Sequence, residues 1–140
     1  MTAPSDAVAL ELDLAHAPQV VWRALTEPAL LSQWLLPIAE LELSPGATFL
    51  FQAEPQPGWD GRVNGRLVEV EPPSRLVYAW VVGDLDTLVT FTLTPTATGT
   101  HLAMQQTGFK PEQGRNLAGA RYGWNMMSGR LVEVLARLAA

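Results

Sequence analysis

The C-terminal end of the chain, residues 115–140, belongs to its longest proline-free run and constrains the fold more than any other stretch. Its apolar residues recur every three or four positions, the spacing of one helix face, at Trp124, Met127, Leu131, Val134, Leu135 and Leu138. Glu133 and Arg137 lie off that face at i, i+4 and are expected to pair. A helix of about 25 residues is roughly 37 Å long, so it needs a broad apolar surface to lie on.

Segments that alternate apolar and polar side chains make up most of the remaining sequence and predict strands with one buried face. The first spans residues 8–14. Two short helices are expected after it, at 19–25 and 27–34, with Thr26 as the N-cap of the second. Further strands are predicted at residues 40–43, 48–53, 63–70, 75–82, 87–94 and 100–107.

The short connections between these strands are typical of an antiparallel meander. A sheet with one apolar face and a long amphipathic helix can bury both surfaces if the helix lies across the sheet. The sequence therefore predicts an α+β fold: a curved antiparallel sheet of about seven strands around a long C-terminal helix, with two short helices after the first strand.

Composition excludes several classes of protein. A chain of 140 residues with 48% apolar and 16% charged residues is expected to fold as one globular domain, residues 1–140. It has no cysteine, so disulfides and thiolate metal sites are excluded. A net charge of −5 with a single lysine gives no nucleic-acid footprint. The sequence shows neither a membrane-spanning apolar run nor a secretory leader, so a cytoplasmic protein is expected.

Catalytic candidates are scarce. There is no GxSxG motif or glycine-rich phosphate loop, and the two histidines, His16 and His101, are interpreted as surface residues. Asp13 is the only carboxylate close to His16 in the sequence, which makes a weak metal site. Glu69 would point inward only if the strand carries a bulge near Gly65. No catalytic residue, metal or cofactor is assigned.

Aromatic residues are more informative, since five tryptophans are many for this length. Each is either core or part of the wall of a cavity that one helix cannot fill. Gln106 is the best polar candidate: it should point inward, either to orient a ligand or to form a structural hydrogen bond to the long helix. The candidate ligand-binding residues are Trp34, Phe51, Trp59, Tyr78, Trp80, Phe91, Met104, Gln106, Trp124 and Met127.

Trp59 lies in a loop rich in proline and glycine, residues 55–61. Such a loop is interpreted either as a lid at the mouth of the cavity or as a compact surface loop pinned by its own tryptophan. The sequence does not decide between these alternatives.

Four pieces of sequence in a fixed order carry a family resemblance. They are VVWRALTEPALLSQWL at residues 20–35; GRLVEVEPPSRLVYAW at 65–80; LVTFTLTP at 88–95 with GTHL at 99–102; and Gly108-Phe109 followed by Gly123-Trp124 and Leu131. Together they resemble the START-like superfamily, in the branch related to the activator of Hsp90 ATPase and to polyketide cyclases. The resemblance implies a helix-grip fold: a curved seven-stranded sheet grips the C-terminal helix, with a cavity between them.

The expected function is the binding of a small hydrophobic or aromatic molecule in that cavity. Two alternatives remain open: a cyclase- or hydrolase-type enzyme acting on such a ligand, and a protein-interaction module resembling the Hsp90 activator. Exposed aromatic loops and short edge strands also leave a homodimer open. Fold does not by itself imply function, so these alternatives must be weighed at the site.

Overall fold

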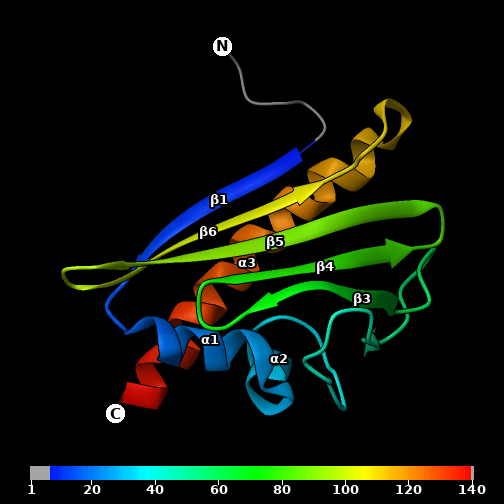
Figure 1. Ribbon diagram of the computed structural model, residues 1–140. Helices are drawn as coiled ribbons and strands as arrows, with labels where there is room; N and C mark the ends of the chain where they lie inside the picture. Colours follow the sequence, from blue (N-terminus) through cyan, green and yellow to red (C-terminus); the bar gives the residue numbers. More distant parts are fainter. Residues whose placement is uncertain (1–6, 140) are drawn as a thin grey trace.

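The computed structural model describes residues 7–139, without the side chain of Ala139. Two stretches lie outside the described residues: residues 1–6, which belong to the segment considered as a secretory leader, and Ala140, the predicted end of the last helix. The elements are, in order, β1 (Ala7–Leu14), α1 (Pro18–Thr26), α2 (Pro28–Trp34), β2 (Thr48–Gln52), β3 (Arg62–Glu71), β4 (Arg75–Val82), β5 (Leu85–Thr96), β6 (Gly99–Thr107), the short 3-10 helix η1 (Pro111–Gln113) and α3 (Gly114–Ala139) (Figure 1).

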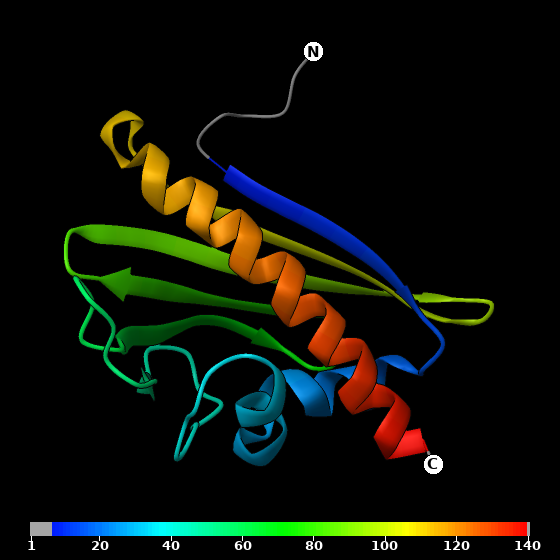
Figure 2. The same ribbon diagram turned by 180° about the vertical axis from the view of Figure 1, so that it is seen from behind.

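All neighbouring strands are antiparallel, in the order β1-β6-β5-β4-β3-β2. Strands β2 to β6 form the predicted meander, and β1 pairs with β6, so the first and last strands lie side by side. Helix α3 crosses one face of the sheet diagonally, while α1 and α2 lie at one end (Figure 2). This arrangement confirms the helix-grip prediction.

The sheet has six strands rather than seven, because residues 40–43 form no strand. Their segment touches the edge strand β2 only near its start, through a bridge between Ile38 and Phe51 and a hydrogen bond from Gln52 N to the Pro37 carbonyl. An alternating pattern indicates only that one side of a segment can be buried, and Leu41 is indeed half-buried. A strand also needs a neighbouring strand that pairs with its backbone N–H and C=O groups along its length.

Three local expectations are wrong. Thr26 does not cap α2, since its hydroxyl donates to the Trp22 carbonyl at 2.8 Å and Glu27 occupies the N-cap position. Arg137 does not pair with Glu133 and instead donates to Gln33 Oε1 at 3.1 Å, which ties α3 to α2.

Glu69 is the third correction. The sheet register does shift between Leu67 and Glu69, which places a bulge there. The Glu69 carboxylate nevertheless faces outward, where Arg75 Nε donates to it at 2.6 Å and both side chains stay partly exposed. A bulge therefore occurs, but it does not bring this acid into the interior.

The two halves of α3 differ in what they bury. The C-terminal half carries Leu131, Val134 and Leu135, each no more than 1% exposed, and packs against α1, α2 and β1. Full burial of one such side chain contributes about 1.5–3 kcal/mol. The N-terminal half presents Ala120 and, at its end, Gly123 towards the sheet, with the exposed Gly119 at the rim of the same space, so it leaves room where the other half fills it.

Candidate functional site

A cavity of about 430 Å³ lies between the N-terminal half of α3, the sheet and the loop that carries Trp59. Its wall is formed mostly by apolar and aromatic side chains, and it reaches the surface, because Gly58, Asn116 and Gly119 are exposed. The lining residues are Leu36, Gly58, Trp59, Val63, Trp80, Val82, Leu85, Gln106, Asn116, Gly119, Ala120, Gly123, Trp124 and Met127. This volume lies in the range of pockets that hold small organic molecules.

A larger hollow, of about 840 Å³, follows the free edge of β2 beside residues 37–40. Much of its wall is exposed, and Glu40, Gln52 and Asn64 make it more polar. The smaller cavity is the better candidate, because it is lined by three tryptophans and borders the polar network described below.

The ten predicted site residues divide into two equal groups. Five of them line the cavity: Trp59, Trp80, Gln106, Trp124 and Met127. The other five lie outside the lining: Trp34, Phe91 and Met104 surround a void of only about 10 Å³, and Phe51 and Tyr78 pack among aromatic rings. Trp124 contributes to both walls, with its ring centroid 5.7 Å from that of Trp80 and 6.1 Å from that of Phe91.

Gln106 is buried and holds a short chain of hydrogen bonds beside the cavity. Trp124 Nε1 donates to Gln106 Oε1 at 2.8 Å, and Gln106 Nε2 donates to Thr87 Oγ1 at 2.9 Å. Thr87 Oγ1 then donates to the Trp80 carbonyl at 2.8 Å. Because an indole N–H can only donate, it fixes the orientation of the amide. The expected structural bond to the long helix is therefore present, and the same side chain forms part of the cavity wall.

The loop at the mouth of the cavity is held by Trp59. The backbones of Gln56 and Trp59 exchange two hydrogen bonds, of 2.8 and 2.9 Å, around a turn at Pro57-Gly58 in which Gly58 has a φ of 81°. Trp59 Nε1 also donates to the Arg62 carbonyl at 3.1 Å. The loop is thus pinned by its own tryptophan, as one of the two interpretations predicted, and it also borders the cavity.

The wall of the cavity carries no charged side chain. None of the fourteen lining residues is ionisable, and Gln106 and Asn116 supply its two side-chain amides. The indole N–H groups of Trp59 and Trp124 are already hydrogen-bonded to the protein. Such a wall offers aromatic faces and neutral amides to a ligand, and it would impose a desolvation cost on a charged one.

Tyr78 carries a buried polar atom without a partner. Its hydroxyl has no hydrogen bond within the described part of the chain, and its ring packs at 5.2 Å from Phe49 and 6.0 Å from Phe91, centroid to centroid. Burial raises the pKa of Tyr78 well above the ordinary range of a phenol, so the group is neutral.

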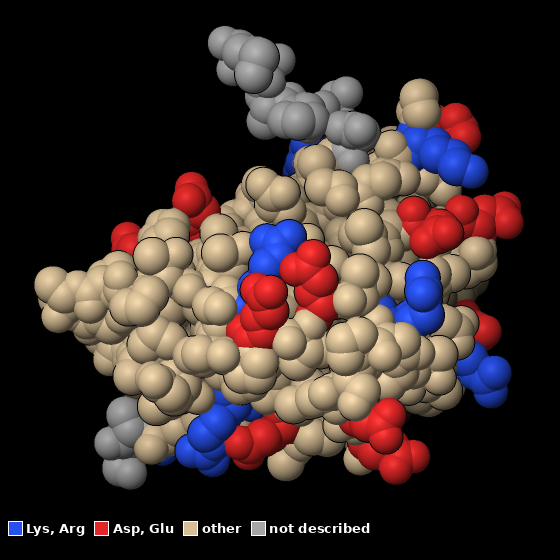
Figure 3. All heavy atoms as spheres, in the orientation of Figure 1, with Lys and Arg blue, Asp and Glu red and all other residues tan. Residues whose placement is uncertain are grey.

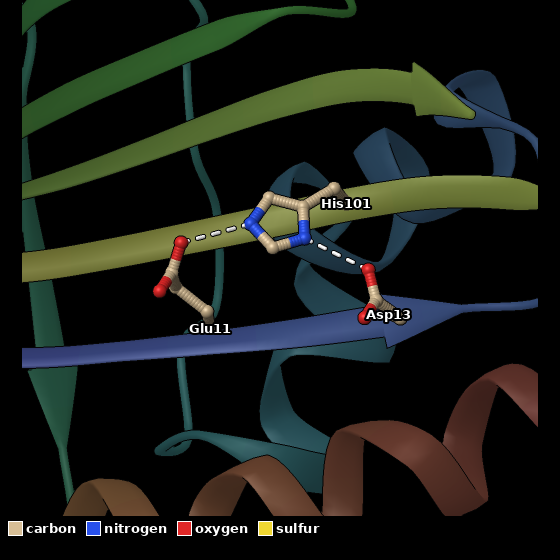
Figure 4. A network of polar contacts seen from close by, with 3 residues as sticks. All are labelled: Glu11, Asp13 and His101. Atoms are coloured by element: carbon tan, nitrogen blue, oxygen red, sulfur yellow. Dashed lines mark hydrogen bonds and ion pairs between the residues drawn. The ribbon is translucent and has the colours of Figure 1, made fainter.

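His101 lies on the outer face of the sheet in a network with two acids (Figure 4). Its Nδ1 lies 2.8 Å from Asp13 Oδ1 and its Nε2 lies 2.9 Å from Glu11 Oε1. These hydrogen bonds, first to Asp13 and then to Glu11, raise the pKa of His101. Asp13 thus pairs with His101 rather than with His16.

No group of three or more His, Cys, Asp or Glu within residues 7–139 is arranged to hold a metal ion. The alternation of apolar and polar residues in the sequence predicted that Glu11, Asp13 and His101 lie on the outer faces of their strands. Only the pairing of β1 with β6, which sets Asp13 opposite His101, brings them together. Apart from the atoms drawn in grey, the face seen in Figure 3 shows no large patch of one sign: one central group contains both acidic and basic side chains, and the other charged side chains are scattered towards the edges.

An antiparallel sheet curved around one C-terminal helix, with two short helices at one end, defines the class as the helix-grip proteins of the START-like superfamily. Residues 15–136 match the Activator of Hsp90 ATPase homolog 1-like protein family, and the chain belongs to that family. The resemblance found in the sequence is thereby confirmed. A search of curated proteins found no match.

Solved structures support the same assignment. Protein MLL2253 of Mesorhizobium loti is similar at 39% identity over 94% of this chain and 97% of its own, with a TM-score of 0.87. A protein of Rhodobacter sphaeroides shares 27% identity over 96% of this chain and 95% of its own, with a TM-score of 0.76. DynU16 shares 26% identity over 95% of this chain and 48% of its own, with a TM-score of 0.79. Within the described residues, no helix is long and apolar enough to span a membrane.

Proposed function

We propose that the protein binds a small uncharged molecule with an apolar or aromatic body in the cavity beside the N-terminal half of α3. The observation that carries this proposal is a space of about 430 Å³ walled by Trp59, Trp80, Trp124 and Met127, with no ionisable side chain among its lining residues. Aromatic faces and a thioether favour flat apolar groups. DynU16, a relative in sequence and fold, is described as a protein of the dynemicin biosynthetic locus, which is compatible with a small-molecule site.

The small residues of α3 supply a second argument. Glycine inside a helix costs about 0.8–1.0 kcal/mol relative to alanine, so its presence calls for a compensating role. A Cβ at Gly119 would meet nothing within 4 Å, and one at Gly123 would meet only Met127 Cε, at 3.8 Å. Packing therefore does not require glycine at either position. Small residues at these two positions do keep the cavity open, because large side chains there would fill it.

A substitution that fills the cavity without destabilising the fold tests the proposal. We expect the neutral probe N-phenyl-1-naphthylamine to gain fluorescence on binding the wild-type protein, and Gly123→Leu to weaken that binding at least about tenfold, or about 1.4 kcal/mol. Gly129→Leu is the matched control: it lies on the same helix, does not line the cavity and has open space around its Cβ.

Both leucines improve helix propensity, so a fall in stability cannot explain a selective loss of binding at Gly123. Equal binding by the two variants would place the probe elsewhere and contradict the proposal. Native mass spectrometry of freshly purified protein provides an independent check, since a co-purified small molecule should be absent from Gly123→Leu.

The two alternative functions predict different outcomes. An enzyme of the cyclase or hydrolase type working by acid–base chemistry needs a titratable group at the ligand, and the cavity wall offers none. A chaperone-interaction module, suggested by the family name, would use an exposed surface and would be insensitive to filling the cavity.

A further inference from the structure

The outward side of α3 carries a regular row of exposed residues. Arg115, Gly119, Tyr122, Met126, Gly129 and Glu133, here called the outer stripe, follow one another at spacings of 4, 3, 4, 3 and 4, and all six are exposed. Tyr122 is 71% exposed and Met126 43%, although both are large and apolar. In Figure 2 the helix lies in front of the sheet, and no other described element covers this side.

The outer stripe of one copy is complementary to the outer stripe of a second copy that runs antiparallel to it. Taking Trp124 as the centre, Tyr122 and Met126 are equally distant from it, as are Gly119 and Gly129, and as are Arg115 and Glu133. In an antiparallel pair of identical helices related by a two-fold axis at this centre, each residue faces its counterpart on the other copy. Arg115 would then meet Glu133 of the second copy, and this ion pair would occur twice.

The side chains at the two ends of the outer stripe are available for this contact. Within residues 7–139, neither Arg115 nor Glu133 takes part in a side-chain hydrogen bond or ion pair in its own protomer. Arg137, the basic residue expected to pair with Glu133, is bonded to Gln33 instead. Charge complementarity of this kind sets the direction and register of an interface more than its affinity.

The middle of the outer stripe fits a close helix contact. Alternating spacings of three and four form the seam along which two helices pack at about 20° with axes 8–10 Å apart. Gly119 and Gly129 would face each other across this contact and allow the backbones to approach, while Tyr122 would pack on Met126 of the other copy.

We propose that the outer stripe is the contact surface of a weak symmetric homodimer, in which the α3 helices of two copies pack antiparallel about Trp124. One helix face buries less than the roughly 800 Å² per partner of a standard stable interface, so association belongs to the weak class. This inference does not depend on the cavity having a ligand.

Charge reversal tests the proposal. Sedimentation velocity from about 10 μM to about 1 mM, the range where a weak interface associates, should show a monomer–dimer equilibrium for the wild-type protein. Arg115→Glu and Glu133→Arg should each raise the dissociation constant at least about tenfold, because each places like charges opposite one another. The double variant Arg115→Glu/Glu133→Arg re-forms both ion pairs in reverse and should return to within about threefold of the wild type.

Two controls make the outcome decisive. Arg66→Glu changes net charge by the same amount on an exposed position of β3 and should leave association unchanged. Circular dichroism and thermal melting establish that each variant is folded, which is expected since all these positions are exposed. A wild-type protein that stays monomeric up to about 1 mM, or a double variant that fails to recover, would overturn the proposal.

Discussion

At the scale of single residues, the interior depends on a few polar atoms whose partners come from distant parts of the chain. Gln106 accepts from Trp124 on α3 and donates to Thr87 on β5, and both contacts are buried. The Tyr78 hydroxyl, two strands away from β6, is buried without such a partner. Buried polar groups are usually paired, so the first arrangement should stabilise the fold and the second should weaken it.

Gln106→Leu should lower the free energy of unfolding by about 1–3 kcal/mol, because it leaves the buried indole N–H of Trp124 without an acceptor. Urea denaturation measures the loss. In a double-mutant cycle with Trp124→Phe, the combined loss should be smaller than the sum of the single losses, since the second change removes the stranded donor. Strictly additive losses would show that the hydrogen bond contributes nothing.

Tyr78→Phe should leave the protein equally stable or raise its free energy of unfolding by about 1 kcal/mol, because it removes a buried hydroxyl that has no partner. Thermal and urea denaturation measure the change. Tyr122→Phe, at an exposed tyrosine on α3, is the control and should have no effect at low protein concentration. A clear loss of stability in Tyr78→Phe would reveal a hydrogen bond to the phenol.

The His101 network predicts a pH dependence. Its folded-state pKa is raised by Asp13 and Glu11 above the value of about 6.5 for an unfolded histidine. Its stabilising contribution is therefore fully present below that pH and is lost as the pH rises through the folded-state pKa.

His101→Gln should consequently be less stable than the wild type at about pH 5.5, and the two proteins should converge at about pH 8.5. Proton NMR of the imidazole in Asp13→Asn should show a lower His101 pKa than in the wild type. A difference in stability that is the same at both pH values would contradict this assignment.

At the scale of elements, the two halves of α3 differ in the size of the side chains that they turn towards the sheet. Leucines and valine after Trp124 fill the space against α1 and α2, whereas the small residues before it leave the cavity open. The sheet contains a comparable pairing of a small residue with a large one: Gly65 on β3 lies opposite Phe49 on β2, and the phenylalanine ring covers the glycine. Such close contacts explain glycines that break an otherwise regular pattern.

Gly65→Ala should destabilise the fold by about 1–3 kcal/mol, because the added Cβ would overlap the ring of Phe49 and force it to move. Guanidinium denaturation measures the loss. Trimming the ring in the double variant Phe49→Leu/Gly65→Ala should make the added methyl group cost less than it does beside phenylalanine. An equal cost in both backgrounds would show that the ring is not the obstacle.

At the scale of the whole molecule, the sheet, the long helix and the two short helices enclose a well-filled core at one end and leave a cavity at the other. The filled end holds Trp34, Phe91 and Met104 around a void of about 10 Å³, and the open end holds the cavity of about 430 Å³. Apart from Gln106 and Trp124, which serve both, stability and ligand binding are thus expected to depend on different residues, which is why cavity-filling variants can separate them.

The sequence by itself determined the elements and their order. Helix α3 and all six strands that form were predicted to within about two residues, since periods of 3.6 and 2 are local properties that the burial of one face imposes. Residues 40–43 carried the same alternation without becoming a strand. The inward orientation of Gln106 followed from alternation as well, and the helix-grip arrangement followed from the order of the elements.

Only the tertiary structure decided which residues meet. The pairing of β1 with β6 sets Asp13 opposite His101 across 88 residues of sequence, and no local pattern specifies that register. The separation of the candidate residues into those that line the cavity and those that fill the core likewise depends on the space left after all side chains have packed. That remaining volume is a sum over the whole molecule, so it has no signature in any one stretch of the chain.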